Sequence, residues 1–232
     1  MQLQQRIAFD DVVARARQSE GESEPAVHRL IARTVEQLGL GGDLLIDVGC
    51  GHGNLWPLLK SRFAKCIGVD AVRYPRLPSN IEFCESRLDS DRIPLADDSA
   101  NLVICSETIE HLENPRALMR ELTRLAKPGA WIVVTTPNQL SLLSLMTLIV
   151  KHRFEYFQDV HYPAHLTALL EVDLRRMAAE VELTECRVEF TMSGRIPFTG
   201  RHYPAALSRI FPRALSDNVL LAARKPPATV AA

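Results

Sequence analysis

The chain has 232 residues, of which 47% are hydrophobic and 24% charged, with 11 glycines and 14 prolines. This composition excludes a disordered, collagen-like or coiled-coil protein, and the length suffices for one well-packed α/β domain. The 27 Lys and Arg residues balance 28 Asp and Glu residues to a net charge of −1. Chains that wrap nucleic acid usually carry a basic excess, so no nucleic-acid partner is expected.

The cysteines and the N-terminus indicate a reducing compartment. The five cysteines form no Cys-x-x-Cys pair, so neither a disulfide framework nor a zinc site is expected: Cys50, Cys66, Cys84, Cys105 and Cys186. The first residues lack the basic segment and apolar run of a signal peptide. The longest apolar run, Leu140–Val150, is shorter than the about 20 residues that span a bilayer. A cytoplasmic location is therefore expected.

Strand and helix patterns alternate along most of the chain. Residues 1–24 are polar and predict an N-terminal arm or helix, and a helical pattern then starts at Pro25 and ends at the glycines 39–42. A second helical face is expected at 55–63. A third helix is expected from Asn114 to a stop at residues 127–129, and a fourth from Thr167, as its cap, to Val181. Strands are predicted at 44–48, 66–70, 81–84, 101–105, 131–136, 184–191 and 218–225.

The alternation predicts the fold class. Strands that are apolar throughout and separated by helices indicate an α/β protein with a parallel sheet covered on both faces. We expect one domain over 25–225, with a lid or substrate-covering insertion at about 139–168, and a flexible tail at 226–232.

The sharpest motif follows the first predicted strand. Gly49, Gly51 and Gly53 alternate after Val48, where glycine permits a tight turn and close approach of a ligand to the backbone. Asp70 ends the next strand, 21 residues after Gly49. A carboxylate at that place can accept hydrogen bonds from both ribose hydroxyls, so the whole pattern predicts a ribose-bearing cofactor.

The spacing of the glycines argues against a dinucleotide. NAD-binding folds use Gly-x-Gly-x-x-Gly, and here Asn54 stands at the third position. Asp47, two residues before Gly49, would repel a pyrophosphate and would suit a cationic ligand. An NAD-dependent oxidoreductase therefore remains only as an alternative.

With these motifs the chain resembles class I S-adenosylmethionine-dependent methyltransferases, most of all the small-molecule branch related to ubiquinone and menaquinone methyltransferases. The resemblance rests on IDVGCGHGN, IGVDA, IPLADDSANLVICSETIEHLENP and ELTRLAKPGAWIVVTTPN, in this order within residues 46–138. It implies a Rossmann-like, doubly wound, seven-stranded and mostly parallel sheet whose last strand is antiparallel. It also implies S-adenosylmethionine as the cofactor.

The resemblance also implies which residues hold the cofactor. Asp47, Gly49, Cys50 and Gly51 would surround its methionine part, and Asp70 its ribose. Ala71 and Leu88 would lie at the adenine, and Cys105 and Ser106, which end the fourth strand, would face the carboxylate and the sulfonium. The sequence departs from the family at Arg87, where an Asp is usual, and we expect Asp89 to take over the adenine contact.

Two histidines are candidate catalytic residues. Methyl transfer to a hydroxyl needs a base, and an imidazole titrates near neutrality. His111 follows the fourth strand, where an acceptor would meet the cofactor; alternatively, Glu110 and His111 organise that loop. His165 is a weaker candidate. His161 and His165 have a spacing that metal sites use, but Pro163 interrupts the helix that would align them, so no metal is predicted.

The predicted function is methyl transfer to a small-molecule acceptor, with O-methylation preferred and a glycan or lipid-linked precursor as a possible acceptor. The apolar stretch from Leu140 to Phe157 is either a lid helix packed on the domain, an apolar substrate pocket or a contact with a membrane-borne substrate. The other alternative is a non-catalytic module that keeps the cofactor-binding fold. The sequence leaves the oligomeric state open.

Overall fold

The computed structural model describes residues 13–19, 21–89 and 92–228. Seven strands form one sheet in the order β3-β2-β1-β4-β5-β7-β6. Strand β7 runs antiparallel to both of its neighbours, and the other pairs are parallel. The predicted Rossmann-like sheet is thereby confirmed. The strands are β1 (Gly42–Val48), β2 (Phe63–Asp70), β3 (Glu82–Glu85), β4 (Ala100–Ser106), β5 (Ala126–Pro137), β6 (Thr184–Phe190) and β7 (Asn218–Arg224).

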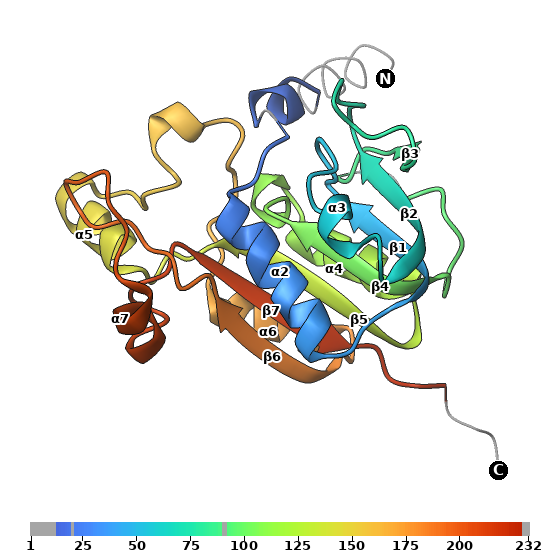
Figure 1. Ribbon diagram of the computed structural model, residues 1–232. Coiled ribbons are helices and arrows are strands. Elements are labelled where there is room, and N and C mark those ends of the chain that lie inside the picture. Colours follow the sequence, from blue (N-terminus) through green and yellow to red (C-terminus); the bar gives the residue numbers. More distant parts are fainter. Residues whose placement is uncertain (1–12, 20, 90–91, 229–232) are drawn as a thin grey trace.

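Helices cover both faces of the sheet (Figure 1). On one face, α2 (Pro25–Gln37) and α3 (Trp56–Leu59) share a core with Leu45 and Leu102. On the other, α4 (Pro115–Leu125) and α6 (Glu171–Glu180) share a second core that includes the next strand residue, Ile46. Successive strand residues point to opposite faces, so a strand that is apolar at every position feeds both cores.

Helix α4 begins as its sequence predicts, but it ends at Leu125, before the expected stop at 127–129, because Ala126 already belongs to β5 and pairs with Ala100. The Asn114 side chain accepts a hydrogen bond from the backbone N–H of Ala117, and Pro115 begins the helix. Leu118, Leu122 and Leu125 lie at three- and four-residue steps and are all buried.

Two predicted helices differ from the observed ones. The pattern at 55–63 yields only the four-residue α3, because Phe63 already belongs to β2, where it pairs with Gly42; Leu58 is exposed. Helix α6 begins at Glu171 rather than beside Thr167. Thr167 lies outside it because its hydroxyl donates to the carbonyl of Leu112, which ties this segment to the loop after β4.

The short helix η1 (Ile109–His111) follows β4 and buries Ile109 in the core shared with α4. The helices α5 (Leu142–Lys151), η2 (Asp159–His161) and α7 (Ala205–Ile210) contribute no residue to the two cores. Figure 1 shows α5 and α7 beyond one end of the sheet. No described helix combines the length and hydrophobicity needed to cross a bilayer. The first part of the predicted arm (1–12) and the end of the predicted tail (229–232) lie outside the described residues, so the domain boundaries stay predictions.

The strand order places a functional site. From β1 the chain proceeds outward to β2 and β3, and then returns to the other side of β1 with β4. At such a reversal the connections leave β1 and β4 in opposite directions, which opens a crevice at their carboxyl ends. Gly49 follows β1 at this crevice, and Glu107 follows β4.

Truncation of a core residue on α4 tests the packing. Leu122→Ala removes a side chain that is 0% exposed and should lower the free energy of unfolding by about 2–5 kcal/mol. Leu58→Ala, at a position that is 47% exposed, is the matched control and should cost less than about 1 kcal/mol. Urea unfolding followed by circular dichroism measures both, and equal losses would contradict this assignment of the core.

Candidate active site

The glycine loop after β1 forms a tight turn. Gly49, Gly51 and Gly53 have φ values of 76°, 49° and 70°, in the left-handed region that favours glycine. The backbone N–H groups of Gly49 and Cys50 both donate to the carbonyl of Val69 at the end of β2. A Cβ at Gly49 would lie 1.9 Å from the hydroxyl oxygen of Thr108, so the loop needs glycine there to pack against the segment after β4.

Asp70 holds this loop in place. Its carboxylate accepts hydrogen bonds from the backbone N–H of Gly51 at 3.0 Å and of Ala71 at 2.7 Å. Burial raises the pKa of Asp70, and the backbone hydrogen bonds oppose that shift. Each carboxylate oxygen accepts one of these two bonds and has further capacity as an acceptor. The carboxylate therefore both fixes the turn and offers acceptor atoms to a ligand.

A cavity of ≈ 390 Å³ lies over the carboxyl ends of β1, β2 and β4, within the size range of small-molecule sites. Nine of the ten residues predicted to bind the cofactor line it. Cys105 does not: its side chain is 0% exposed and belongs to the core shared with α4. Successive residues of a strand face opposite sides, so the neighbouring Ser106 reaches the cavity instead. The nine are Asp47, Gly49, Cys50, Gly51, Asp70, Ala71, Leu88, Asp89 and Ser106.

Asp89 lines the cavity, but its two oxygens already have partners. One is 2.8 Å from the guanidinium of Arg15, and the other accepts from the backbone N–H of Glu113 at 2.7 Å. Burial is the largest influence on Asp89 and raises its pKa, whereas these partners lower it. Asp89 thus joins the N-terminal segment to the loop after η1, and the adenine contact predicted for it stays a prediction.

The N-terminal segment is part of the cavity wall, which the sequence did not predict. Residues 15–24 contribute Arg15, Ser19 and Gly21, and the carbonyl of Gly21 accepts from the backbone N–H of His52 in the glycine loop. The hydroxyl of Tyr74 donates to the carbonyl of Ala16. A polar segment without periodicity gives no signal of such a role, because its partners are distant in sequence.

The loop after β4 brings two buried glutamates to the cavity. Glu107 has φ 47°, a sparsely populated conformation for this residue type, and accepts from the side-chain N–H of Asn218 at 2.6 Å. Glu110 is 1% exposed and accepts from the hydroxyl of Thr136. One carboxylate oxygen of each glutamate is buried without a hydrogen-bond partner among the described residues. Burial raises the pKa of both, that of Glu110 to about 8, so the Glu110 carboxyl favours the protonated form at neutral pH.

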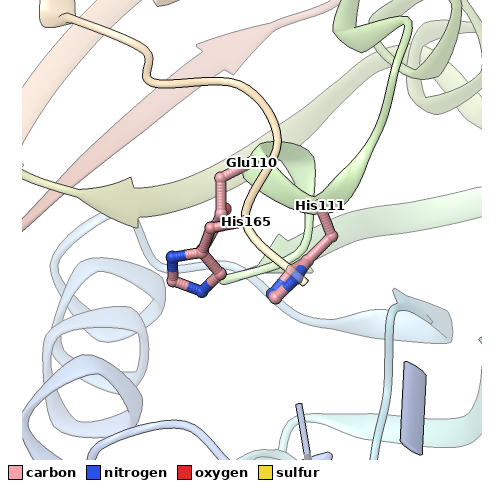
Figure 2. A group of neighbouring side chains, drawn as sticks. All are labelled: Glu110, His111 and His165. Carbon is pink, nitrogen blue, oxygen red and sulfur yellow. The ribbon is translucent and has the colours of Figure 1, made fainter. Parts of the chain in front are cut away.

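His111 and His165 lie together at the same end of the cavity. Their ring centroids are 4.7 Å apart, and Figure 2 shows both rings beside Glu110. Nδ1 of His111 lies 2.8 Å from the carbonyl of Ala164, and Nδ1 of His165 lies 2.6 Å from that of Tyr156. A carbonyl only accepts, so Nδ1 carries the proton in both rings and Nε2 has the lone pair.

Burial lowers the pKa of both histidines, that of His165 to about 4, where the neighbouring His111 contributes as well. Both imidazoles are therefore neutral at pH 7. The loop that carries His165 is fixed to η1, because the backbone N–H groups of Leu166 and Thr167 both donate to the carbonyl of Glu110. Glu110 and His111 thus both hold the loop at 164–167, and His111 also lines the cavity; its role as a base stays a prediction.

The same three side chains form a donor set for a cation. Glu110, His111 and His165 each offer one ligand atom, and these atoms lie within 4.8 Å of one another. Two imidazoles and a carboxylate suit a divalent transition metal. The sequence predicted no metal ligands, because it gave no sign that His111 and His165 would meet across 53 intervening residues.

Residues 16–185 match the profile of the family described as "Methyltransferase domain". The match covers well over half of the chain. The chain belongs to the methyltransferase family. Its cofactor is accordingly S-adenosylmethionine, as predicted.

Curated relatives include two ubiquinone biosynthesis O-methyltransferases. The one from Erwinia tasmaniensis is 29% identical over 154 residues, which are 61% of this chain and 63% of the relative. The one from Pseudomonas paraeruginosa is 32% identical over 112 residues, 45% of this chain and 48% of the relative. The matches thus cover less than two thirds of these relatives.

Solved structures share the fold at low identity. A SAM-dependent methyltransferase from Archaeoglobus fulgidus superposes with a TM-score of 0.62 at 18% identity, covering 85% of this chain and 94% of the other. The [4+2]-cyclase SpnF superposes with a TM-score of 0.57 at 17% identity, covering 86% and 82%. A cyclase on the same fold shows that the fold alone does not set the reaction.

The cavity has the chemistry that this cofactor needs. Asp70 can accept from the ribose hydroxyls. The carboxylate of Asp47 has no hydrogen-bond partner among the described residues, and burial, with the nearby Asp70 second, raises its pKa to about 7. A nearby positive charge would stabilise the ionised form of this buried carboxylate, and S-adenosylmethionine carries a sulfonium and an ammonium group. These are roles that we assign to Asp47 and Asp70 as proposals.

Removal of the Asp70 carboxylate should abolish cofactor binding. Asp70→Ala deletes the ribose acceptor and releases the N–H groups of Gly51 and Ala71, and a hydrogen bond to a charged group contributes about 1.5–3 kcal/mol. Titration calorimetry with S-adenosylhomocysteine measures the loss. Asp43→Ala, at an exposed position near the start of β1, is the control and should bind normally. Retained binding by Asp70→Ala would remove Asp70 from the site.

Cofactor affinity should depend on pH through Asp47. Its carboxyl must ionise to attract the cationic ligand, so affinity is present above about pH 7 and is lost as the pH falls below it. Between pH 8 and pH 6 the dissociation constant for S-adenosylmethionine should rise by about tenfold. Asp47→Asn should bind more weakly at pH 8 and lose most of this dependence. An Asn variant with the full pH profile would assign the titration to another group.

Proposed function

We propose that the protein transfers a methyl group from S-adenosylmethionine to a hydroxyl oxygen of a small molecule bound beside His111 and His165. The observation that carries the proposal is the pair of neutral imidazoles at the cavity wall, both with Nδ1 bonded to a backbone carbonyl. Such a ring presents Nε2 as a proton acceptor in a fixed orientation. The O-methyltransferase names of the curated relatives support the same choice of atom.

His111 is proposed as the base. The bound cofactor supplies a methyl group on a positively charged sulfur, which is a good electrophile without further activation. The acceptor hydroxyl donates its proton to Nε2 of His111 as its oxygen forms the new O–CH3 bond and the S–CH3 bond breaks. His165 packs edge-on against His111 and holds its orientation. The protonated carboxyl of Glu110 can hydrogen-bond a second oxygen of the acceptor, and the buried side chain of Glu107 lines the cavity beside it.

Alignment of the acceptor contributes more to the rate of methyl transfer than proton abstraction does. Placing the oxygen in line with the S–CH3 bond, away from water, can supply about 7–11 kcal/mol of the barrier reduction. Proton abstraction typically adds a factor of about 10²–10⁴. Hydroxylated benzenes are the acceptors to try first, because a phenol is acidic enough for an imidazole base.

Substitution of His111 tests the assignment. His111→Ala and His111→Gln should lower turnover of a dihydroxybenzene by about 10²–10⁴-fold and leave the affinity for S-adenosylmethionine unchanged. His152→Ala, at an exposed position that ends α5, should retain turnover. Transfer of a labelled methyl group measures turnover, and calorimetry measures affinity.

Unchanged turnover in both His111 variants would remove it as the base. Each assay is repeated with a chelator. Loss of turnover on chelation would instead assign the activation of the hydroxyl to a metal held by Glu110, His111 and His165.

A further inference from the structure

Helix α5 has its polar and apolar sides reversed. Its buried residues are Ser144 and Thr147, whereas Ile149 is 76% and Val150 is 70% exposed. The hydroxyls have partners inside the protein: Thr147 donates to the carboxylate of Glu155, and Ser144 faces Gln139. An ordinary surface helix turns its apolar stripe to the core and its polar residues to water. Here the polar side packs on the protein, and the apolar side faces outward.

The neighbouring helix α7 repeats this reversal. Its one buried residue is Ser208, while Ile210 is 68% exposed and Phe211, which follows it, 56%. A hydrogen bond joins the two segments: the backbone N–H of Leu142, which begins α5, donates to the carbonyl of Ala214, which follows α7. We name residues 139–168 and 192–216 the outer lobe. Figure 1 shows its helices at the end of the molecule beyond the sheet.

Exposed large hydrophobic residues concentrate on the outer lobe. Among the described residues twelve are exposed, and ten of these belong to the lobe. The other two, Leu58 and Val172, lie on α3 and α6. Single exposed apolar residues are normal on a soluble surface, but a gathering of this kind marks an interaction surface. The ten are Leu142, Leu145, Ile149, Val150, Val160, Tyr162, Phe198, Leu207, Ile210 and Phe211.

The charge of the lobe indicates what it meets. Residues 192–216 contain four arginines and no acidic residue, although the whole chain has a net charge of −1. Lys151, Arg201 and Arg209 are exposed and have no carboxylate partner among the described residues. The other cations of the lobe are paired: Arg153 with Asp159, Arg195 with Asp217 and Arg213 with Glu171. Among the described residues of the lobe, the charges without a partner of opposite sign are therefore all positive.

This combination fits an anionic bilayer better than a second copy of the chain. Basic residues beside an apolar helix face attach it to acidic head groups while the apolar side chains enter the boundary with the acyl chains. A symmetric contact between two lobes would oppose like charges, which costs affinity.

The lobe also forms part of the acceptor end of the cavity. Tyr156, His161 and His165 line the cavity, and Val160 both lines it and is 75% exposed. A molecule held in a bilayer under the lobe would thus reach the histidines past Val160, without crossing the rest of the protein.

We propose that the outer lobe docks on an anionic lipid bilayer and that the acceptor is an amphiphile whose hydroxyl-bearing head group enters the cavity from that bilayer. The second clause rests on the proposed function; the docking itself does not. Ile149 and Phe198 belong to the lobe and do not line the cavity, so substitutions there test docking separately from catalysis.

Vesicle binding by the full chain is the test. Vesicles of phosphatidylcholine mixed with phosphatidylglycerol should sediment the protein, and vesicles of phosphatidylcholine alone should do so at least about tenfold more weakly. High salt should reduce the binding to the anionic vesicles. The double variant Ile149→Glu with Phe198→Glu should lose at least about tenfold in vesicle affinity. Leu58→Glu with Val172→Glu, two exposed positions outside the lobe, is the matched control and should bind vesicles as the unchanged chain does.

Two further measurements separate the possible failures. The lobe variant should keep its affinity for S-adenosylmethionine and its turnover of a water-soluble dihydroxybenzene, which shows that it is folded. No sedimentation of the unchanged chain with anionic vesicles, or equal losses in the two double variants, would overturn the docking. A dimer in analytical ultracentrifugation that the lobe variant alone converts to a monomer would overturn it in favour of a second copy. Failure of methyl transfer with intact vesicle binding would count against the proposed function and not against docking.

Discussion

The carboxylate of Asp70 is the contact on which the site depends. It ends β2 and accepts from the backbone N–H of Gly51, so it fixes the loop that leaves the neighbouring strand β1. The loop in turn needs glycine, because Thr108 and Gly21 occupy the space that side chains would take at Gly49 and Gly51. One buried charge thus holds together the end of the central strands, the segment after β4 and the N-terminal segment. Its remaining acceptor capacity faces the cavity.

Two kinds of loop complete the cavity from opposite ends. The N-terminal segment closes one end through the ion pair of Arg15 with Asp89, which is largely buried. At the other end the segment after η2 is fixed to the carbonyl of Glu110 by two backbone hydrogen bonds. The cofactor end consists of strand termini that the sheet makes rigid, whereas the acceptor end consists of loops and a lobe outside the two cores. This division suits a family that keeps one cofactor and varies its acceptors.

The sequence predicted what local pattern determines. Strand runs such as Leu44–Val48, the capped helix after Asn114 and the alternating glycines are each set by residues close in sequence, and their positions in the structure agree. Nine of ten expected cofactor residues line the cavity for the same reason, since the carboxyl ends of parallel strands meet at one edge. Cys105 is the exception. Successive strand residues face opposite sides, so Ser106 reaches the cavity and Cys105 packs in the core shared with α4.

Long-range contacts account for what the sequence did not predict. Arg15 meets Asp89 across 74 positions, and Asn218 meets Glu107 across 111. The reversed polarity of α5 was equally hidden, because a run of leucines with two hydroxyl residues does not say which side faces water. The apolar stretch from Leu140 to Phe157 has two environments: Tyr156 lines the cavity, and Ile149 is exposed on the outer lobe, for which we propose membrane contact.

Calorimetric titration of the unchanged chain with S-adenosylmethionine, S-adenosylhomocysteine and NAD tests the central claim most directly. The geometry at Asp47, Gly51 and Asp70 predicts micromolar binding of the first two, one molecule per chain, and none of NAD. Binding of NAD in preference to S-adenosylmethionine would contradict the account, because it would assign the glycine loop to the dinucleotide site of a dehydrogenase.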